Sequence, residues 1–140
     1  MANTFRSTCP LNIALELFGD KWSLLVMRNM LVIGHYRYRE FLGAPESIST
    51  NILSDRLKSL EANGFVEKLP DPKDGKSAYY LPTEFGLTLL PVLFELLRWG
   101  STHYEDTLLP ERVATALAGD TQVFVNLRES EVREIRAELT

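Results

Sequence analysis

The stretch that decides the fold is residues 37–58, RYREFLGAPESISTNILSDRLK. A short polar and aromatic segment ends at Leu42, a turn follows through Gly43 and Pro45, and Ser49 precedes a longer segment. Ser49 suits a helix N-cap, because its hydroxyl can accept a hydrogen bond from the first turn. The apolar residues of the longer segment recur at helical spacing: Ile52, Leu53, Leu57 and Leu60. These features predict two helices joined by a tight turn, the helix-turn-helix arrangement.

A β-hairpin is predicted directly behind this unit. Asn63-Gly64 ends the long helix, and two strand candidates follow at 65–69 and 77–81. Residues 70–76 between them are rich in Pro, Asp and Gly, which predicts a longer, charged hairpin tip. A hairpin in this place forms a wing. The predicted fold class is therefore mainly α with a small β-hairpin, a winged helix-turn-helix with N- and C-terminal dimerisation helices.

Two helices are expected before the central unit. The first begins at Pro10, whose missing N–H would have no partner in a first helical turn, and ends at Gly19. Asp20 is a suitable cap for the second, which is apolar on all sides up to Gly34. A helix that is apolar all round belongs in the centre of a domain.

Another helix is expected after the hairpin. Thr83 is its predicted cap, and Pro91 predicts a kink or a local break within it. We expect residues 1–109 to form the DNA-binding and dimerisation domain. Residues 110–140 would then be a C-terminal extension that is partly helical.

The extension is harder to assign from its pattern. Residues 111–118 look helical, and Gly119-Asp120 breaks that pattern. Residues 121–126 suit a strand or an irregular turn, and residues 130–139 look helical again.

Composition excludes several classes of protein. The chain has 140 residues, a net charge of −4, 45% hydrophobic residues and one cysteine. One cysteine cannot form an internal disulfide, and it leaves too few ligands for a cysteine-rich zinc site. A signal peptide and a membrane-spanning run are not expected, so the expected location is the cytoplasm. We expect neither an enzyme nor a cofactor, since a phosphate loop, a metal cluster and a nucleophile–base pair are all lacking.

The charge is distributed unevenly along the chain. Residues 21–80 carry nine Lys and Arg against seven Asp and Glu, whereas the remainder carries six against twelve. Phosphate contacts dominate the affinity of proteins for DNA. A basic centre between acidic flanks therefore favours a nucleic-acid-binding face on the helix-turn-helix and wing.

Several motifs in order resemble the HxlR-type winged-helix regulators over roughly residues 9–103. The motifs are CP at 9–10, GDKWS at 19–23, RYREF at 37–41, ISTNILSDRLK at 48–58, GFVE at 64–67, TEFG at 83–86 and LLPVL at 89–93. The resemblance implies bacterial or archaeal homodimers that bind pseudo-palindromic operators in double-stranded DNA. Pro82 departs from the usual aliphatic residue, and the tail from Pro110 lies outside the pattern.

Candidate DNA-binding residues lie on three segments. On the long helix, short polar side chains would read base edges in the major groove. Basic side chains on the short helix and near the wing tip would reach phosphates. Arg56 of the long helix suits either a phosphate contact or a structural ion pair. The predicted DNA-binding residues are Thr50, Asn51, Ser54, Arg56, Arg37, Arg39, Lys73 and Lys76.

Cys9 is the candidate sensor. It precedes the first helix, where the helix dipole favours a thiolate, and several members of the family use a cysteine at this position to sense oxidants, quinones or aldehydes. An inert thiol is the alternative reading. The expected effector is an electrophile that modifies Cys9, or else a small molecule that binds near the dimer interface. With one cysteine per chain, any protein disulfide would join two chains.

The outer helices offer more apolar surface than a small three-helix core can use. We expect them to form a homodimer interface that includes Leu11, Leu15, Leu90, Leu93 and Leu97. A core within one chain is the alternative. For the whole chain, the competing function is a winged-helix protein-interaction module without specific DNA binding.

Overall fold

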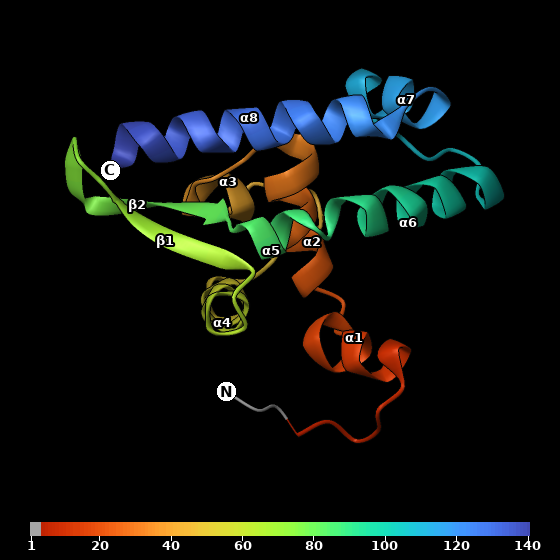
Figure 1. Ribbon diagram of the computed structural model, residues 1–140, viewed down its shortest axis with the longest axis horizontal. Coiled ribbons are helices and arrows are strands. Elements are labelled where there is room, and N and C mark those ends of the chain that lie inside the picture. Colours follow the sequence, from red (N-terminus) through yellow and green to blue (C-terminus); the bar gives the residue numbers. More distant parts are fainter. Residues whose placement is uncertain (1–3) are drawn as a thin grey trace.

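The central helix-turn-helix forms as the sequence predicts. The structure is a computed structural model that describes residues 4–140 (Figure 1). The turn of the unit joins α3 (Tyr38–Leu42) to α4 (Thr50–Ala62). Ser49 caps α4, because its hydroxyl accepts a hydrogen bond from the backbone N–H of Ile52 at 3.3 Å. The inward stripe of α4 is buried at Leu53, Leu57 and Leu60.

The wing is longer than the sequence pattern indicated. Strands β1 (Val66–Asp71) and β2 (Asp74–Pro82) pair antiparallel, so the expected long tip is wrong and the ladder reaches Asp71 and Asp74. The carboxylates of these two residues accept hydrogen bonds from the backbone N–H groups of Lys73 and Lys76, at 2.9 and 3.1 Å. These local bonds fold the tip into a tight turn and extend the wing.

The first part of the chain forms the helices that the sequence predicts. Helix α1 (Pro10–Phe18) ends at Gly19, and α2 (Ser23–Arg28) continues into a π-helical turn, η1 (Asn29–Ile33). The π-helical turn was not predicted. Gly34 ends it in the left-handed region with φ 88°, a conformation that glycine adopts without a Cβ clash.

The predicted break at Pro91 is confirmed. A short helix, α5 (Glu84–Leu87), is capped by Thr83, whose hydroxyl accepts from the N–H of Gly86 at 2.9 Å. Pro91 then lies in the first turn of a separate helix, α6 (Leu90–His103). Proline is tolerated in a first turn, where its missing N–H removes no helical hydrogen bond.

The C-terminal extension consists of two helices. Helix α7 (Glu111–Ala118) is followed by α8 (Thr121–Leu139), so the predicted strand or irregular turn at residues 121–126 is wrong. Asp120 caps α8 by accepting from the N–H of Gln122 at 2.9 Å. Burial of Phe124 and Val125 against the rest of the chain stabilises a first turn whose local pattern did not favour a helix.

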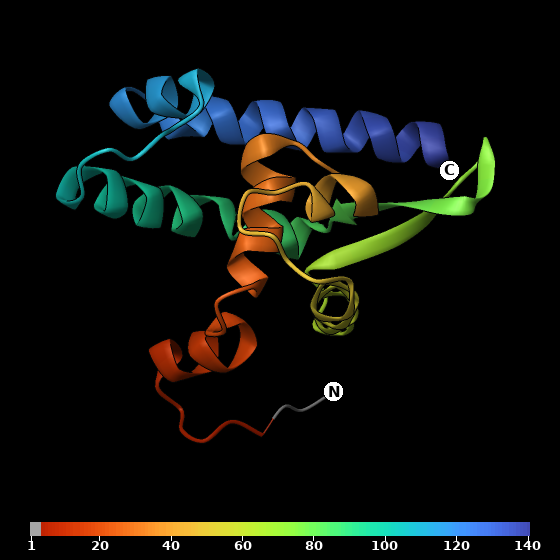
Figure 2. The ribbon, with the colours of Figure 1, turned by 180° about the vertical axis from the view of Figure 1, so that it is seen from behind.

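The extension shares one core with the winged helix-turn-helix. Helix α8 runs along one edge of the molecule, α6 lies beside it, and α2 passes between them and α1 (Figures 1 and 2). Buried side chains from α2, the helix-turn-helix, the wing, α6, α7 and α8 meet in this core, including Met27, Met30, Phe41, Leu53, Phe65, Phe94, Val113, Phe124 and Val132. Across residues 4–140, each helix is too short or too polar to cross a membrane.

Two of the residues expected at a dimer interface belong to this core. Leu90 and Leu93 are buried within their own chain, so the expectation that they face a second protomer is corrected. They occupy the inner face of α6, because residues three apart on a helix share a face. Of the other residues expected at the interface, Leu11 and Leu15 are exposed on α1 and Leu97 is half-buried.

Candidate nucleic-acid interface

The first turn of α4 presents polar side chains to solvent. Thr50 and Asn51 are exposed there, while the backbone oxygen of Thr50 accepts a hydrogen bond from the hydroxyl of Tyr38 at 3.1 Å. The N-terminal residues of a recognition helix are the ones that contact base edges in helix-turn-helix proteins. This turn therefore has the chemistry and the exposure that base reading requires.

Ser54 lies in the contact between the two helices of the unit. Its hydroxyl hydrogen-bonds with the hydroxyl of Tyr38 at 2.9 Å, and the side chain is half-buried. Ser54 thus helps to fix α4 against α3.

Arg56 is engaged in ion pairs. Its Nε lies 3.5 Å from Asp20 Oδ2, and its Nη2 lies 3.8 Å from Asp55 Oδ2. Burial opposes ionisation of Asp20, but hydrogen bonds from Ser23 and Trp22 and the charge of Arg56 lower the pKa of this carboxyl overall. Arg56 therefore links α4 to the start of α2.

Arg37 connects the start of α3 to the wing. Its guanidinium donates to Asp71 Oδ2 and to Ser77 Oγ, each at 3.0 Å, and it lies 4.1 Å from the centre of the Tyr79 ring. The backbone N–H of Lys73 and the guanidinium of Arg37 hold the pKa of Asp71 below its usual value. These contacts place Arg37 as a link between α3 and the wing.

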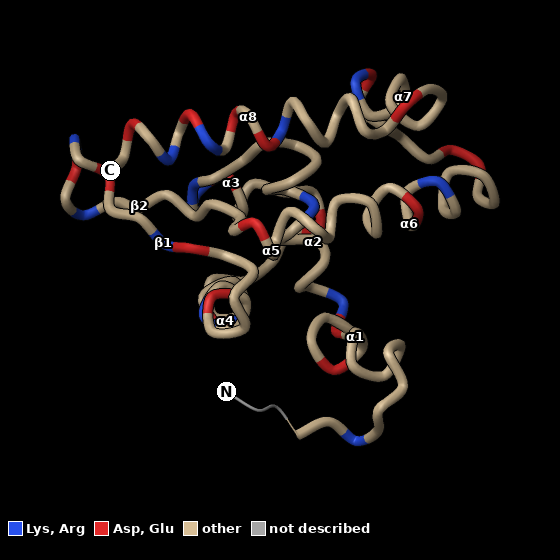
Figure 3. The backbone as a smooth tube through the Cα atoms, in the orientation of Figure 1, with Lys and Arg blue, Asp and Glu red and all other residues tan. Residues whose placement is uncertain are grey.

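Several exposed basic side chains lie on α3 and on the wing. Arg39, Lys73 and Lys76 are exposed. A cleft of about 730 Å³ between α3 and the wing is lined by Arg39, Lys76 and Lys68 together with Glu40 and Asp74. Basic and acidic positions lie close together at the hairpin tip in Figure 3. The basic side chains are suited to phosphate contacts beside the base-reading turn.

Cys9 is exposed at the N-terminal end of α1. Hydrogen bonds from the backbone N–H groups of Asn12 and Leu11 lower the pKa of its thiol. A thiolate is the reactive form of cysteine. The environment of Cys9 thus favours reaction with an electrophile or an oxidant.

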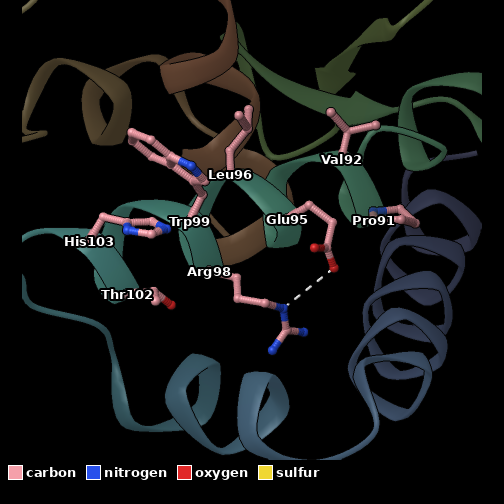
Figure 4. A pocket seen from close by; sticks show the side chains of 8 residues that line it. All are labelled: Pro91, Val92, Glu95, Leu96, Arg98, Trp99, Thr102 and His103. Atoms are coloured by element: carbon pink, nitrogen blue, oxygen red, sulfur yellow. Dashed lines mark ion pairs between the residues drawn. The ribbon is translucent and has the colours of Figure 1, made fainter.

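An apolar surface lies on the outer face of α6, away from the core. Val92, Leu96 and Trp99 are four and three residues apart, so they share one face, and all three are exposed. They line a groove of about 830 Å³ together with Glu95 and Arg98, which form an ion pair at 3.5 Å (Figure 4). An apolar helix face that is open to solvent indicates an interaction surface.

Sequence reasoning missed a buried polar cluster that supports the site. Arg128 and Glu131 of α8 meet the hydroxyl of Tyr36, just before α3. The one available signal was spacing: Arg128 falls midway between Phe124 and Val132 on the apolar stripe of α8, where a charged residue is unusual.

The fold and the exposed polar face together define a winged helix-turn-helix protein. Its short and long helices are followed by a hairpin wing, and exposed basic residues flank the recognition turn. The chain belongs to the HxlR-like helix-turn-helix family, whose model matches residues 17–107. The members of this family are transcriptional regulators and not enzymes.

Similar proteins in Bacillus subtilis are named as helix-turn-helix (HTH) transcriptional regulators. The chain is 32% identical to the HTH-type transcriptional regulator YybR over 95 residues, which cover 68% of this chain and 75% of YybR. It is 33% identical to the HTH-type transcriptional regulator YodB over 114 residues, which cover 79% of this chain and 98% of YodB.

Solved structures of redox regulators have the same fold. The oxidised form of the redox regulator HypR matches 69% of this chain and 99% of its own, with 30% identity and a TM-score of 0.60. Reduced YodB from B. subtilis matches 73% of this chain and 100% of its own, with 31% identity and a TM-score of 0.56. Quinone-bound YodB matches 67% of this chain and 99% of its own, with 32% identity and a TM-score of 0.53.

Proposed function

We propose that the protein is a homodimeric regulator that places α4 of each protomer in the major groove of a pseudo-palindromic operator. The observation that carries this proposal is the exposed first turn of α4, where Thr50 and Asn51 are open to solvent, together with the exposed Lys73 and Lys76 of the wing. An asparagine can make paired hydrogen bonds to adenine in the major groove. Lys73, Lys76 and Arg39 would hold the duplex through its phosphates.

The dimer is proposed to form through α1 and α6. Every residue of α1 (Pro10–Phe18) is at least partly exposed, and this helix projects from the body of the molecule (Figure 2). Leu11 is 66% exposed and Leu15 is 51% exposed, and on α6 Leu96 and Trp99 are 52% and 59% exposed. A second copy of the chain would cover these surfaces in a two-fold arrangement.

Cys9 is the proposed control point. Cys9 immediately precedes α1, at the edge of the proposed dimerisation region, and the pKa of its thiol is lowered. A relative of this chain has been solved with a quinone bound, and another in an oxidised form. Addition of an electrophile to Cys9, or a disulfide between Cys9 residues of two chains, would change how α1 packs and so the relative position of the two α4 helices. The modification can change the DNA affinity only by as much as it favours one arrangement of the two α4 helices over the other.

The direct test is DNA binding measured by fluorescence anisotropy. The purified protein is titrated onto DNA from upstream of its own gene and of neighbouring genes, at two salt concentrations, with excess unrelated DNA as competitor. We expect tight binding to one segment that weakens as salt rises. Asn51→Ala should weaken binding to that segment by about 1–3 kcal/mol. Glu61→Ala, an exposed change at the far end of α4, is the matched control and should leave it intact.

Quinone or a mild thiol oxidant is then added to the complex. If the reagent abolishes DNA binding by the unaltered protein but not by Cys9→Ser, the thiol of Cys9 is the sensor. Binding that the oxidant does not affect rejects the role of Cys9 and retains DNA binding. Equal, weak binding to every DNA segment contradicts the regulator and favours a winged-helix module that binds protein.

A further inference from the structure

Arg128 is a buried cation in α8, beyond the residues that the family model matches. Its exposed fraction is 3%. Its guanidinium donates to the backbone oxygens of Leu31 and Val32, at 2.8 and 3.1 Å. These carbonyls belong to the last turn of η1, where a helix has no N–H groups of its own left to pair with them. Arg128 therefore caps the helix that leads into the helix-turn-helix, and it does so from a distant part of the chain.

Tyr36 connects the same guanidinium to two further elements. The Tyr36 hydroxyl accepts from Arg128 at 3.3 Å and donates to Glu131 at 2.8 Å. Its backbone oxygen accepts from the N–H of Tyr80 in β2 at 2.7 Å, and its backbone N–H donates to Glu40 of α3 at 3.2 Å. One residue thus ties α8 to both the wing and the helix-turn-helix. Burial raises the pKa of the Tyr36 hydroxyl, which keeps this donor protonated.

The connection continues to the recognition helix. Tyr38 begins α3 two residues after Tyr36, and its hydroxyl bonds to the Thr50 oxygen and to Ser54 in α4. Hydrogen bonds therefore join Arg128 to Tyr36 and Tyr38 to the start of α4, and the two-residue backbone segment from Tyr36 to Tyr38 connects these contacts.

A second contact joins α8 to the base of the wing. Arg136 donates to the backbone oxygen of Pro82 in β2 at 3.0 Å and lies 3.2 Å from Glu67 in β1. Helix α8 extends from α7 to the hairpin along one edge of the molecule (Figure 1). It thus holds the helix-turn-helix at one point and both strands of the wing at another.

We propose that α8 sets the position of the wing and of α4 relative to each other, with Arg128 as the positioning residue. The tail then governs DNA affinity from behind the DNA-reading elements. This inference rests on the proposed DNA binding. It assigns a role in DNA binding to residues 121–139, which lie outside the segment that the family model matches.

The test compares Arg128→Met with two matched variants of the full chain. Arg133→Met removes an exposed arginine from the same helix. Ala116→Gly loosens the buried face of α7 and leaves the hydrogen bonds of Arg128 in place. Circular dichroism on heating gives the stability of each variant, and anisotropy on the DNA segment that the unaltered protein binds best gives its affinity at a temperature where all are folded.

We expect Arg128→Met to bind that segment about tenfold more weakly, a typical strength of coupling between sites. Arg133→Met and Ala116→Gly should stay within about twofold of the unaltered protein, as expected of independent sites. Should Arg128→Met fail to fold, Tyr36→Phe removes one hydroxyl and tests the same connection, with the same direction of change. Unchanged affinity in the folded variant, or an equal loss in Ala116→Gly, overturns the proposal.

Hydrogen exchange separates this inference from the proposed function. Amides of residues 36–42 and 74–82 should exchange faster in Arg128→Met, while those of α6 should not change. If the unaltered protein binds no DNA specifically, the proposed function fails, and the exchange result still decides whether Arg128 positions these elements. Unchanged exchange in both segments rejects the positioning role.

Discussion

At Gly34 both the backbone conformation and the lack of space disfavour a side chain. Its φ is +88°, and a Cβ atom built there would lie 2.6 Å from Arg128 Nη1. We expect Gly34→Ala to lower the free energy of unfolding by at least about 1–2 kcal/mol, the cost of a left-handed conformation alone. Urea denaturation measures this change.

Gly100→Ala is the matched control for that measurement. Gly100 lies within α6, and a Cβ there would meet nothing within 4 Å. Alanine is favoured over glycine inside a helix, so this change should raise the free energy of unfolding by about 0.5–1 kcal/mol. Unchanged stability in Gly34→Ala would show that the end of η1 tolerates a side chain.

Cys9 should react at a lower pH than an ordinary thiol. The neighbouring backbone N–H groups of Asn12 and Leu11 stabilise its thiolate, which lowers the pKa. Alkylation by iodoacetamide requires the thiolate, so its rate should rise with pH to a midpoint below the ordinary thiol value of about 8.5. Mass spectrometry over a series of pH values gives this midpoint. A midpoint at or above the ordinary value would contradict an activated thiol.

At this scale the sequence predicted local roles better than distant partners. The caps Ser49 and Thr83 were identified correctly, because a capping hydroxyl bonds within three residues of itself. For Arg56 the sequence left a phosphate contact and a structural ion pair open, and the structure shows an ion pair with Asp20. The ion pair of Arg37 with Asp71 was not predicted. The partner of a long charged side chain depends on which elements meet, and helical spacing carries no information about that.

At the scale of elements, the wing should contribute to DNA affinity through contacts with the phosphates of the DNA backbone. Lys73 and Lys76 are exposed at its tip, and their backbone N–H groups are fixed by Asp71 and Asp74. We expect Lys73→Ala and Lys76→Ala each to reduce the slope of log affinity against log salt by about 1, with equal weakening on all sequences. Titrations at several salt concentrations measure the slope. Arg133→Ala, an exposed change on α8, should leave it unchanged, and an unchanged slope in both lysine variants would exclude the wing from the DNA interface.

The elements themselves were predictable where local signals were strong. The helix-turn-helix, the hairpin and the break at Pro91 all follow from caps, turn residues and periodicity. The start of α8 was misread, since Phe124 and Val125 favour a helix there only through burial against other elements. The full length of the wing was also missed, because the bonds of Asp71 and Asp74 turned a segment rich in turn residues into strand ends.

At the scale of the whole molecule, the exposed apolar faces should join two chains. Leu96→Glu places a carboxylate in the proposed interface, where two-fold symmetry brings a second copy of the charge close to it. We expect a monomer in sedimentation analysis at micromolar concentrations. Leu127→Glu alters an equally exposed leucine on α8 and should remain dimeric. A dimer in Leu96→Glu would remove α6 from the interface.

The burial of Leu90 and Leu93 shows why sequence alone could not outline that interface. Both faces of α6 carry large apolar residues, and periodicity does not tell which face meets the chain's own core. The structure separates them: the inner face packs on the core, and Val92, Leu96 and Trp99 stay open.

The most direct measurement of the central claim is a hydroxyl-radical footprint of the protein on the DNA segment it binds best. A dimer with one α4 per half-site should protect two patches about 34–36 Å apart, one turn of the duplex, on the same face. Asn51→Ala should weaken both patches together. A single patch, or no protection above that of unrelated DNA, would contradict a dimer that reads two successive major grooves.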